Sequence, residues 1–242
     1  VTGDRLRALL DATRAFAFET ERLEEAGIQI ISALDERFPT LLRDRMAHGC
    51  PPHVFAAGDL STMQQPTLSI VGESNSTVPI HLSTRRAVAA AVVAGWSIAT
   101  ADSVSAGDLA STVTDEAVAC EASLLVLTSA GINRAARQPD LRKLVQTSAV
   151  CLLSPFSPNA PESGAATRAR DSMLHAVGNL TLVASCGDGT GPTWNAAFEA
   201  VQREPASVLV VTGQGAPEGN LALAALGAQQ LGDIDDLAGM LS

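Results

Sequence analysis

Three apolar runs in this chain end in glycine, and this pattern limits the possible folds more than any other feature. The runs lead to Gly72, to the glycine-rich turn 187–191 and to Gly213. Glycine at a strand end leaves room for a tight turn with exposed N–H groups. In a parallel sheet such turns lie together at the carboxyl edge, where anionic ligands usually bind. The sequence therefore predicts a parallel sheet with a phosphate-type crevice at one edge.

Strand-like and helix-like segments alternate from residue 66 onward. Expected strands are 67–71, 96–100, 123–128, 149–153, 180–184 and 207–212, and expected helices are 84–94, 106–120, 139–147, 165–177, 193–202 and 221–230. Such alternation is typical of an α/β fold with a doubly wound, mainly parallel, Rossmann-like sheet and right-handed crossovers.

The first 60 residues follow a different pattern. Residues 4–26 carry apolar side chains at roughly helical spacing and are followed by Gly27, and a short strand is expected over 28–32. We interpret residues 1–60 as a small helical and extended lead-in and residues 61–242 as the Rossmann-like domain. A second full domain is not expected in a chain of 242 residues.

The charge balance limits the partners of the chain. It has 26 acidic and 16 basic residues, a net charge of -10, and Lys143 as its single lysine. Such a surface repels duplex DNA and anionic membranes unless the basic groups cluster. No apolar run is long enough for a membrane helix and no signal peptide is visible, so a cytoplasmic protein without membrane contact is expected.

Neither the cysteines nor the histidines are spaced like metal ligands. The cysteines lie far apart, which predicts reduced, buried thiols, at Cys50, Cys120, Cys151 and Cys186. The four histidines are scattered and form no catalytic triad pattern. We therefore expect no metal and no other cofactor.

A series of short motifs runs from about residue 27 to residue 230. They are Ile30-Ile31-Ser32, Phe38-Pro39-Thr40-Leu41-Leu42, Pro51-Pro52, Gly58-Asp59, Ile70-Val71-Gly72, Asn75-Ser76, Gly95-Trp96-Ser97-Ile98, Leu152-Leu153-Ser154, Arg168-Ala169-Arg170, Thr190-Gly191, Gly213, Gly219-Asn220 and Gly227-Ala228. In this order and spacing they resemble the DprA/Smf DNA-processing family. The resemblance implies a Rossmann-like domain that binds single-stranded DNA in a basic pocket and loads a recombinase-type partner in natural transformation.

The same resemblance implies that two copies pair through their Rossmann-like domains. The run 221–226 is apolar enough to bury more than one side of its helix. A homodimer is therefore our hypothesis.

Several positions that would face phosphate depart from the family pattern. The family's Ser-Arg-Asn is replaced by Glu73-Ser74-Asn75, its Arg-Asn-Arg by Arg170-Asp171-Ser172, and a glutamate by Ser185. Residues 100–108 lack its paired glycines and a basic position. Each lost arginine removes a bidentate contact and each new carboxylate repels phosphate. At about 1.5–3 kcal/mol for a hydrogen bond to a charged group, DNA binding is expected to weaken by several decades.

The expected ligand-binding or DNA-binding residues come from two turns and one helix. They are Gly72, Ser74, Asn75, Arg168, Arg170, Gly189, Thr190 and Gly191. Backbone N–H groups in 72–75 and 189–191 would hold an anion, with Arg170 assisting. Each residue also has a structural interpretation: the glycines permit tight turns, Asn75 caps a helix, Pro192 starts one, and the arginines form a solvated face. We expect Trp96 and Trp194 in the core.

An enzymatic alternative comes from phosphoribohydrolases with a related fold. Their Gly-Gly-x-Gly-Thr-x-x-Glu signature places a glutamate one turn into a helix, whereas the first acid after the turn here is Glu199, about two turns too deep. General acid–base catalysis needs a carboxylate within hydrogen-bond reach of the substrate. We therefore expect no catalytic residues and no enzymatic activity.

The sequence favours a DprA/Smf-like, non-enzymatic DNA-processing protein that binds single-stranded DNA weakly, protein partners, or both, in DNA uptake, transformation or recombination. The alternative is a nucleotide-type ligand sensor or scaffold that has lost DNA binding. Six arginines distinguish the two hypotheses. If they share one basic face, DNA binding is favoured, and if acidic residues lie among them, the sensor or scaffold is favoured. They are Arg85, Arg86, Arg134, Arg137, Arg168 and Arg170.

Overall fold

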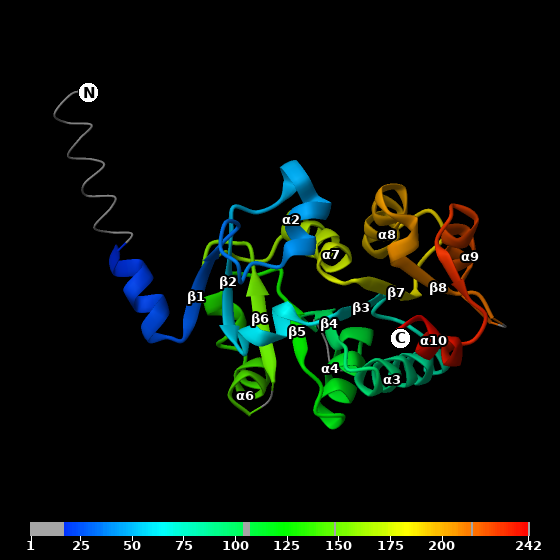
Figure 1. Cartoon of the computed structure of the whole chain (residues 1–242), viewed down its shortest axis with the longest axis horizontal. Coiled ribbons are helices and arrows are strands. Elements are labelled where there is room, and N and C mark those ends of the chain that lie inside the picture. Colours follow the sequence, from blue (N-terminus) through cyan, green and yellow to red (C-terminus); the bar gives the residue numbers. More distant parts are fainter. Residues whose placement is uncertain (1–16, 104–106, 148, 214, 242) are drawn as a thin grey trace.

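The computed structural model describes residues 17–103, 107–147, 149–213 and 215–241 and is organised around one sheet (Figure 1). Its strands are β1 (Ile28–Ser32), β2 (His53–Gly58), β3 (Thr67–Gly72), β4 (Ser97–Ala101), β5 (Leu124–Leu127), β6 (Val150–Ser154), β7 (Leu180–Ser185), β8 (Val208–Val211) and β9 (Gln229–Leu231). They form a nine-stranded sheet in the order β1-β2-β6-β5-β4-β3-β7-β8-β9.

The chain changes direction across the sheet at β3. This strand pairs in parallel with β4 on one side, at Leu68 and Ile98, and with β7 on the other, at Ile70 and Leu182. In a doubly wound sheet such a switch point opens a crevice at the carboxyl ends of the strands. All neighbours from β6 to β9 are parallel. The predicted α/β, doubly wound, mainly parallel architecture is confirmed.

Helices cover both faces of the sheet. They are α2 (Thr40–Met46), α3 (Val78–Val93), α4 (Leu109–Ala119), α5 (Ile132–Ala135), α6 (Pro139–Thr147), α7 (Gly164–Val177), α8 (Pro192–Arg203), α9 (Glu218–Ala225) and α10 (Leu237–Met240). In the view of Figure 1, α2, α7, α8 and α9 lie above the sheet and α3, α4, α6 and α10 lie below it. A further helix spans residues 17–25 beside β1.

Alternation along the strands divides the core between the two faces. Leu124 and Val126 of β5 pack in the cluster that contains α3 and α4 residues, whereas Leu125 and Leu127 pack in the cluster that contains α2 and α7 residues. Successive side chains of a strand point to opposite faces. A sheet buried on both faces therefore needs continuous apolar strands, which is the pattern the sequence shows.

The segment before residue 60 contributes to the same sheet. β2 pairs antiparallel with β6, and β1 pairs antiparallel with β2. Leu23, Ile28 and Phe55 share one core cluster with Leu68 of β3. The lead-in thus extends the sheet past β6 at one edge.

Two expected helices differ from the observed ones. The prediction of a helix to residue 230 was wrong, because α9 ends at Ala225 and Gln229–Leu231 form β9. Gly227 has a φ of 111°, a conformation that ends helices and favours glycine. The helix expected from residue 84 begins at Val78, with Pro79 in its first turn. The expectations for residues 4–16 and 106 lie outside the described residues.

Trp96 packs against the core, as expected. Its ring packs against the cluster beneath the sheet, and Nε1 donates a hydrogen bond to the Leu241 carbonyl at 2.9 Å. Trp194 is half-buried and stacks on Phe198, with ring centroids 6.2 Å apart. Neither ring lines the crevice at the switch point.

Candidate functional site

A cavity of about 320 Å³ opens where β3 and β4 end, at the switch point of the sheet. Gly72, Ser74 and Asn75 line it from the β3 side, Arg170 lines it from α7, and Pro192 lines it from the start of α8. A Cβ atom at Gly72 would lie 2.2 Å from Leu109 Cδ2. The glycine therefore allows α4 to approach the end of β3 closely.

Arg170, the expected cation of this crevice, is held by two carboxylates. Its Nη1 donates to Asp102 Oδ1 at 2.6 Å, and its Nη2 donates to Asp171 Oδ1 at 2.8 Å. Nε also donates to Asp171 Oδ1, at 3.0 Å. Asp102 is itself fixed at the end of β4 by the Thr128 hydroxyl, which donates to Oδ2 at 2.8 Å.

Among the described residues, this buried network leaves the lining of the crevice without a spare positive charge. The side chains of Arg170 and Asp102 are 9% and 3% exposed. Burial lowers the pKa of the Arg170 guanidinium, but Asp171 and Asp102 outweigh burial and raise that pKa above its ordinary value. Glu73 adds another acidic group to the lining. One arginine paired with two carboxylates does not attract a phosphate.

The turn after β3 is hydrogen-bonded to the end of β7. The Glu73 N–H donates to the Ser185 carbonyl at 3.2 Å and to its Oγ at 3.1 Å. The Ser76 hydroxyl donates to the Glu73 carbonyl at 2.6 Å and also lies 2.6 Å from Ser185 Oγ. The N–H of Glu73, within the segment 72–75 expected to hold an anion, is thus already used.

The glycine-rich turn before α8 lies beside the crevice. Gly189, Thr190 and Gly191 are exposed, and the two glycines have φ values of 68° and 94°. They are not part of the cavity lining. A Cβ atom at Gly187 would lie 3.1 Å from Glu73 Oε1, so a carboxylate faces this turn. Positive φ explains the glycines at 189 and 191 without a ligand.

Arg168 lies outside the crevice. It is exposed on α7, and it does not line the cavity although Arg170 does. The structure therefore brings Gly72, Ser74, Asn75 and Arg170 together in the lining of the cavity. Arg168 and the turn 189–191 lie outside that lining.

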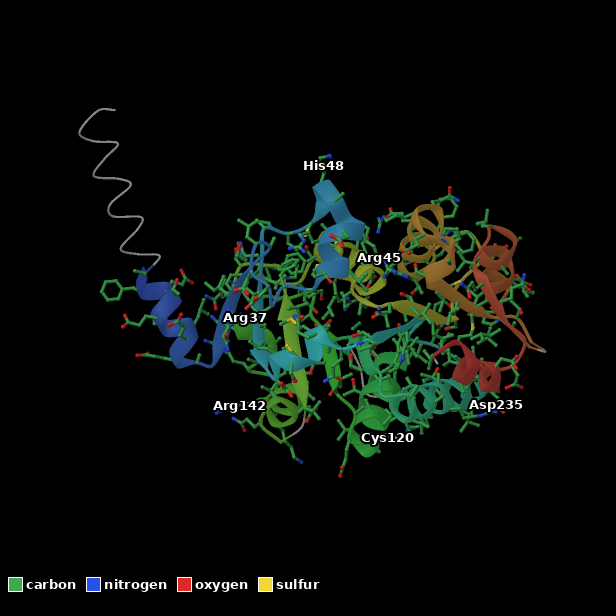
Figure 2. All side chains as sticks on the ribbon, viewed as in Figure 1. Arg37, Arg45, His48, Cys120, Arg142 and Asp235 are labelled. Carbon is green, nitrogen blue, oxygen red and sulfur yellow. The ribbon has the colours of Figure 1, made fainter. Side chains whose placement is uncertain are left out.

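Acids are interleaved with the arginines proposed as a basic patch. Arg85 pairs with Glu116 at 2.7 Å on the α3–α4 face. Arg86 pairs with Asp233 and Asp235, and Asp235 lies at the opposite end of the molecule from Arg142 (Figure 2). Arg85, Arg86 and Arg170 are therefore already compensated by protein carboxylates.

Asn220 anchors α9 to the sheet, a role that was not predicted from the sequence. Its side chain is fully buried, and Nδ2 donates to the carbonyls of Val183 at 3.1 Å and Val211 at 3.3 Å. The Cys186 thiol donates to Oδ1 at 3.5 Å. A Cβ atom at the preceding Gly219 would lie 2.3 Å from the Gly187 carbonyl oxygen. The Gly219-Asn220 motif therefore docks α9 onto the ends of β7 and β8.

His175 also lines the crevice and makes the protein sensitive to acid. Burial lowers its pKa to about 4, and Arg203 and Arg45 add to the effect. Its Nδ1 has no hydrogen-bond partner among the described residues. The pKa of His175 is about 6.5 in the unfolded chain and about 4 in the folded chain, so the unfolded chain binds more protons between these pH values. The contribution of the neutral imidazole to the free energy of unfolding is therefore full above pH 6.5 and is lost as the pH falls toward 4.

We expect about 2 kcal/mol of unfolding free energy to be lost through His175 between about pH 7.5 and pH 5. Urea denaturation at both pH values measures this loss, and His175→Leu should remove it. His48→Leu is the matched control, because His48 projects into solvent just after α2 (Figure 2). An unchanged pH dependence in His175→Leu would contradict the assignment.

The thiols and acids of the described residues form no metal site. No group of three or more His, Cys, Asp or Glu side chains among them could hold a metal ion. The four cysteines are free, with Cys151 and Cys186 buried and Cys50 and Cys120 half-buried. Within the described part of the chain, no helix is long and apolar enough to cross a membrane.

The order of the motifs and the nine-stranded sheet agree with a known family. The family model of the DNA recombination-mediator protein A matches residues 29–242. This chain belongs to the DNA recombination-mediator protein A family. A comparison with curated proteins gives no significant match.

Two solved structures of recombination-mediator relatives share the fold. The DNA processing protein A of Streptococcus pneumoniae aligns with a TM-score of 0.75 at 16% identity, over 94% of this chain and 80% of that chain. The DNA processing protein A of Helicobacter pylori, studied for its single-stranded DNA binding mode, aligns with a TM-score of 0.69 at 15% identity, over 88% and 95%.

The fold also occurs outside the recombination-mediator family. A molybdenum cofactor binding protein of Rippkaea orientalis aligns with a TM-score of 0.53 at 9% identity, over 73% of this chain and 95% of that chain. At these identities each structure is similar in fold alone. The family match, and not this likeness, carries the assignment.

Proposed function

We propose that this recombination-mediator protein is a non-enzymatic DNA-processing protein that binds single-stranded DNA weakly. Family membership and the DNA-binding Helicobacter pylori relative support the substrate class. The observation that carries the weak affinity is the pairing of Arg170 with Asp102 and Asp171. A guanidinium that already satisfies two buried carboxylates has little left to offer a phosphate.

The proposal includes action in the cytoplasm, with a recombinase-type partner and as a homodimer. Leu221 and Leu226, in and just after α9, are 48% and 43% exposed. Both leucines belong to the apolar run 221–226. They support the α9 end of the domain as the pairing surface.

Fluorescence anisotropy with labelled oligo-dT at two salt concentrations tests the proposed affinity. We expect dissociation constants in the micromolar range or weaker and a shallow dependence on salt, because few phosphates are neutralised. Nanomolar binding with a steep salt dependence would show that the paired crevice does not limit affinity.

A second candidate is a nucleotide-type ligand sensor or scaffold without DNA binding. The carboxylates paired with Arg85, Arg86 and Arg170 favour it over strong DNA binding. If oligo-dT does not bind at low salt, this candidate replaces the first.

A further inference from the structure

A second cavity, of about 510 Å³, lies far from the switch point and has the opposite charge. It runs between the helix over residues 17–25, the strands β1 and β2, and the helices α5 and α6. Arg22, Arg137 and Arg142 line it, and Glu19 is the one acidic residue among its described lining. We call this cavity the arginine groove. In a chain of net charge -10, this local excess of positive charge is unusual.

The three arginines of the groove are available to a ligand. Arg22, Arg137 and Arg142 are exposed, and none of them forms an ion pair with another described residue. Figure 2 shows Arg142 on α6 at the end of the molecule where the helix over residues 17–25 lies. The groove therefore differs from the crevice, where the guanidinium of Arg170 is consumed by the protein itself.

Helix α6 separates charge between its two sides. Arg142 and Gln146, one turn apart, face the arginine groove, whereas Asp140 and Leu144 line a different cavity together with Asp115 of α4. Residues four apart on a helix share one face. The acid of α6 is thus turned away from the groove and does not offset the charge of Arg142 there.

Neutral donors complete the wall. The Asn133 amide donates to Asn159 Oδ1 at 3.2 Å and joins α5 to the segment after β6. Gln146 adds another amide from α6. Side-chain amides beside arginines are typical of surfaces that contact phosphate and sugar.

The arrangement suits an extended polyanion better than a single compact anion. The three arginines come from three separate segments and are exposed, so they do not converge on one desolvated point. Arginine is the side chain best matched to phosphate. We propose that the arginine groove binds the backbone phosphates of single-stranded DNA, a role that rests on the proposed function and moves the main DNA contact away from the crevice.

Oligo-dT anisotropy on the whole protein tests this proposal with two triple variants of equal charge change. The groove variant is Arg22→Gln, Arg137→Gln and Arg142→Gln. The control is Arg43→Gln, Arg86→Gln and Arg203→Gln, three exposed arginines elsewhere. Each phosphate contact to a single strand contributes about -0.7 to the slope of the logarithm of the binding constant against the logarithm of the salt concentration. Loss of the three arginine contacts should therefore make this slope shallower by about 2 in the groove variant.

We expect the groove variant to bind at least about tenfold more weakly than the wild type at low salt, and the control to change by less than about threefold. Replacing the same groove residues with lysine should keep most of the binding and the salt slope. If the groove variant binds DNA as tightly as the wild type, or if the control loses as much affinity as the groove variant, the groove is not the DNA site. The proposed function would remain intact in either case. Absence of binding by the wild type would overturn both. Displacement of DNA by poly-glutamate at equal charge would assign the groove to acidic peptides and overturn its DNA role.

Discussion

Replacing Arg170 with methionine should lower the free energy of unfolding by about 3–5 kcal/mol, as expected when one partner of a buried ion pair is removed. The substitution leaves the buried carboxylates of Asp102 and Asp171 without their shared cation. Methionine fills much of the same space, so the loss reports charge more than packing. Urea denaturation at neutral pH measures the effect.

Arg168→Met is the matched control, because Arg168 lies on the same helix but is exposed. We expect its effect to stay within about 0.5 kcal/mol. Adding Asp102→Asn to Arg170→Met should recover part of the stability, because one uncompensated charge is removed. Equal losses in the two methionine variants would mean that the Arg170 network does not stabilise the fold.

Replacing Asn220 with leucine should cost about 2–4 kcal/mol, because an unsatisfied buried polar group costs about 1–3 kcal/mol. The leucine cannot donate to the carbonyls of Val183 and Val211, which receive the Asn220 amide at the ends of β7 and β8. Thermal or urea denaturation gives the magnitude. Hydrogen exchange should show faster opening of α9.

Asn195→Leu is the control for this second substitution, since Asn195 is exposed on α8. Its effect on stability should be within about 0.5 kcal/mol. If Asn220→Leu were as mild, α9 would have to be held by the packing of Leu223 and its neighbours alone.

The sheet could be predicted from the sequence because its strands carry a local signal. Continuous apolar runs such as 180–184 and 207–212 are required by burial on both faces, and glycines mark where the strands turn. β9 lacks that signal, since Gln229 and Gln230 are polar and follow a helix-like run. Its pairing with β8 is decided by tertiary contacts.

The candidate site could be predicted only in part. The positions of Gly72, Asn75 and Arg170 at the crevice follow from the order of strands and turns. The pairing of Arg170 with Asp102 does not, because 68 positions separate them and the sequence shows no local pattern that joins them. The arginine groove could not be predicted for the same reason, because it brings Arg22 together with Arg137 and Arg142 from a distant segment of the chain.

The short strand β9 has a consequence for how molecules of this protein can meet. It forms the outer edge of the sheet beyond β8 and spans only Gln229–Leu231, with Gly232 directly after it. An edge this short presents few unpaired backbone groups, so another chain cannot readily extend the sheet there. Self-association at this end of the domain must therefore use helix surfaces. The shortness of β9 alone disfavours growth of the sheet into open-ended fibres.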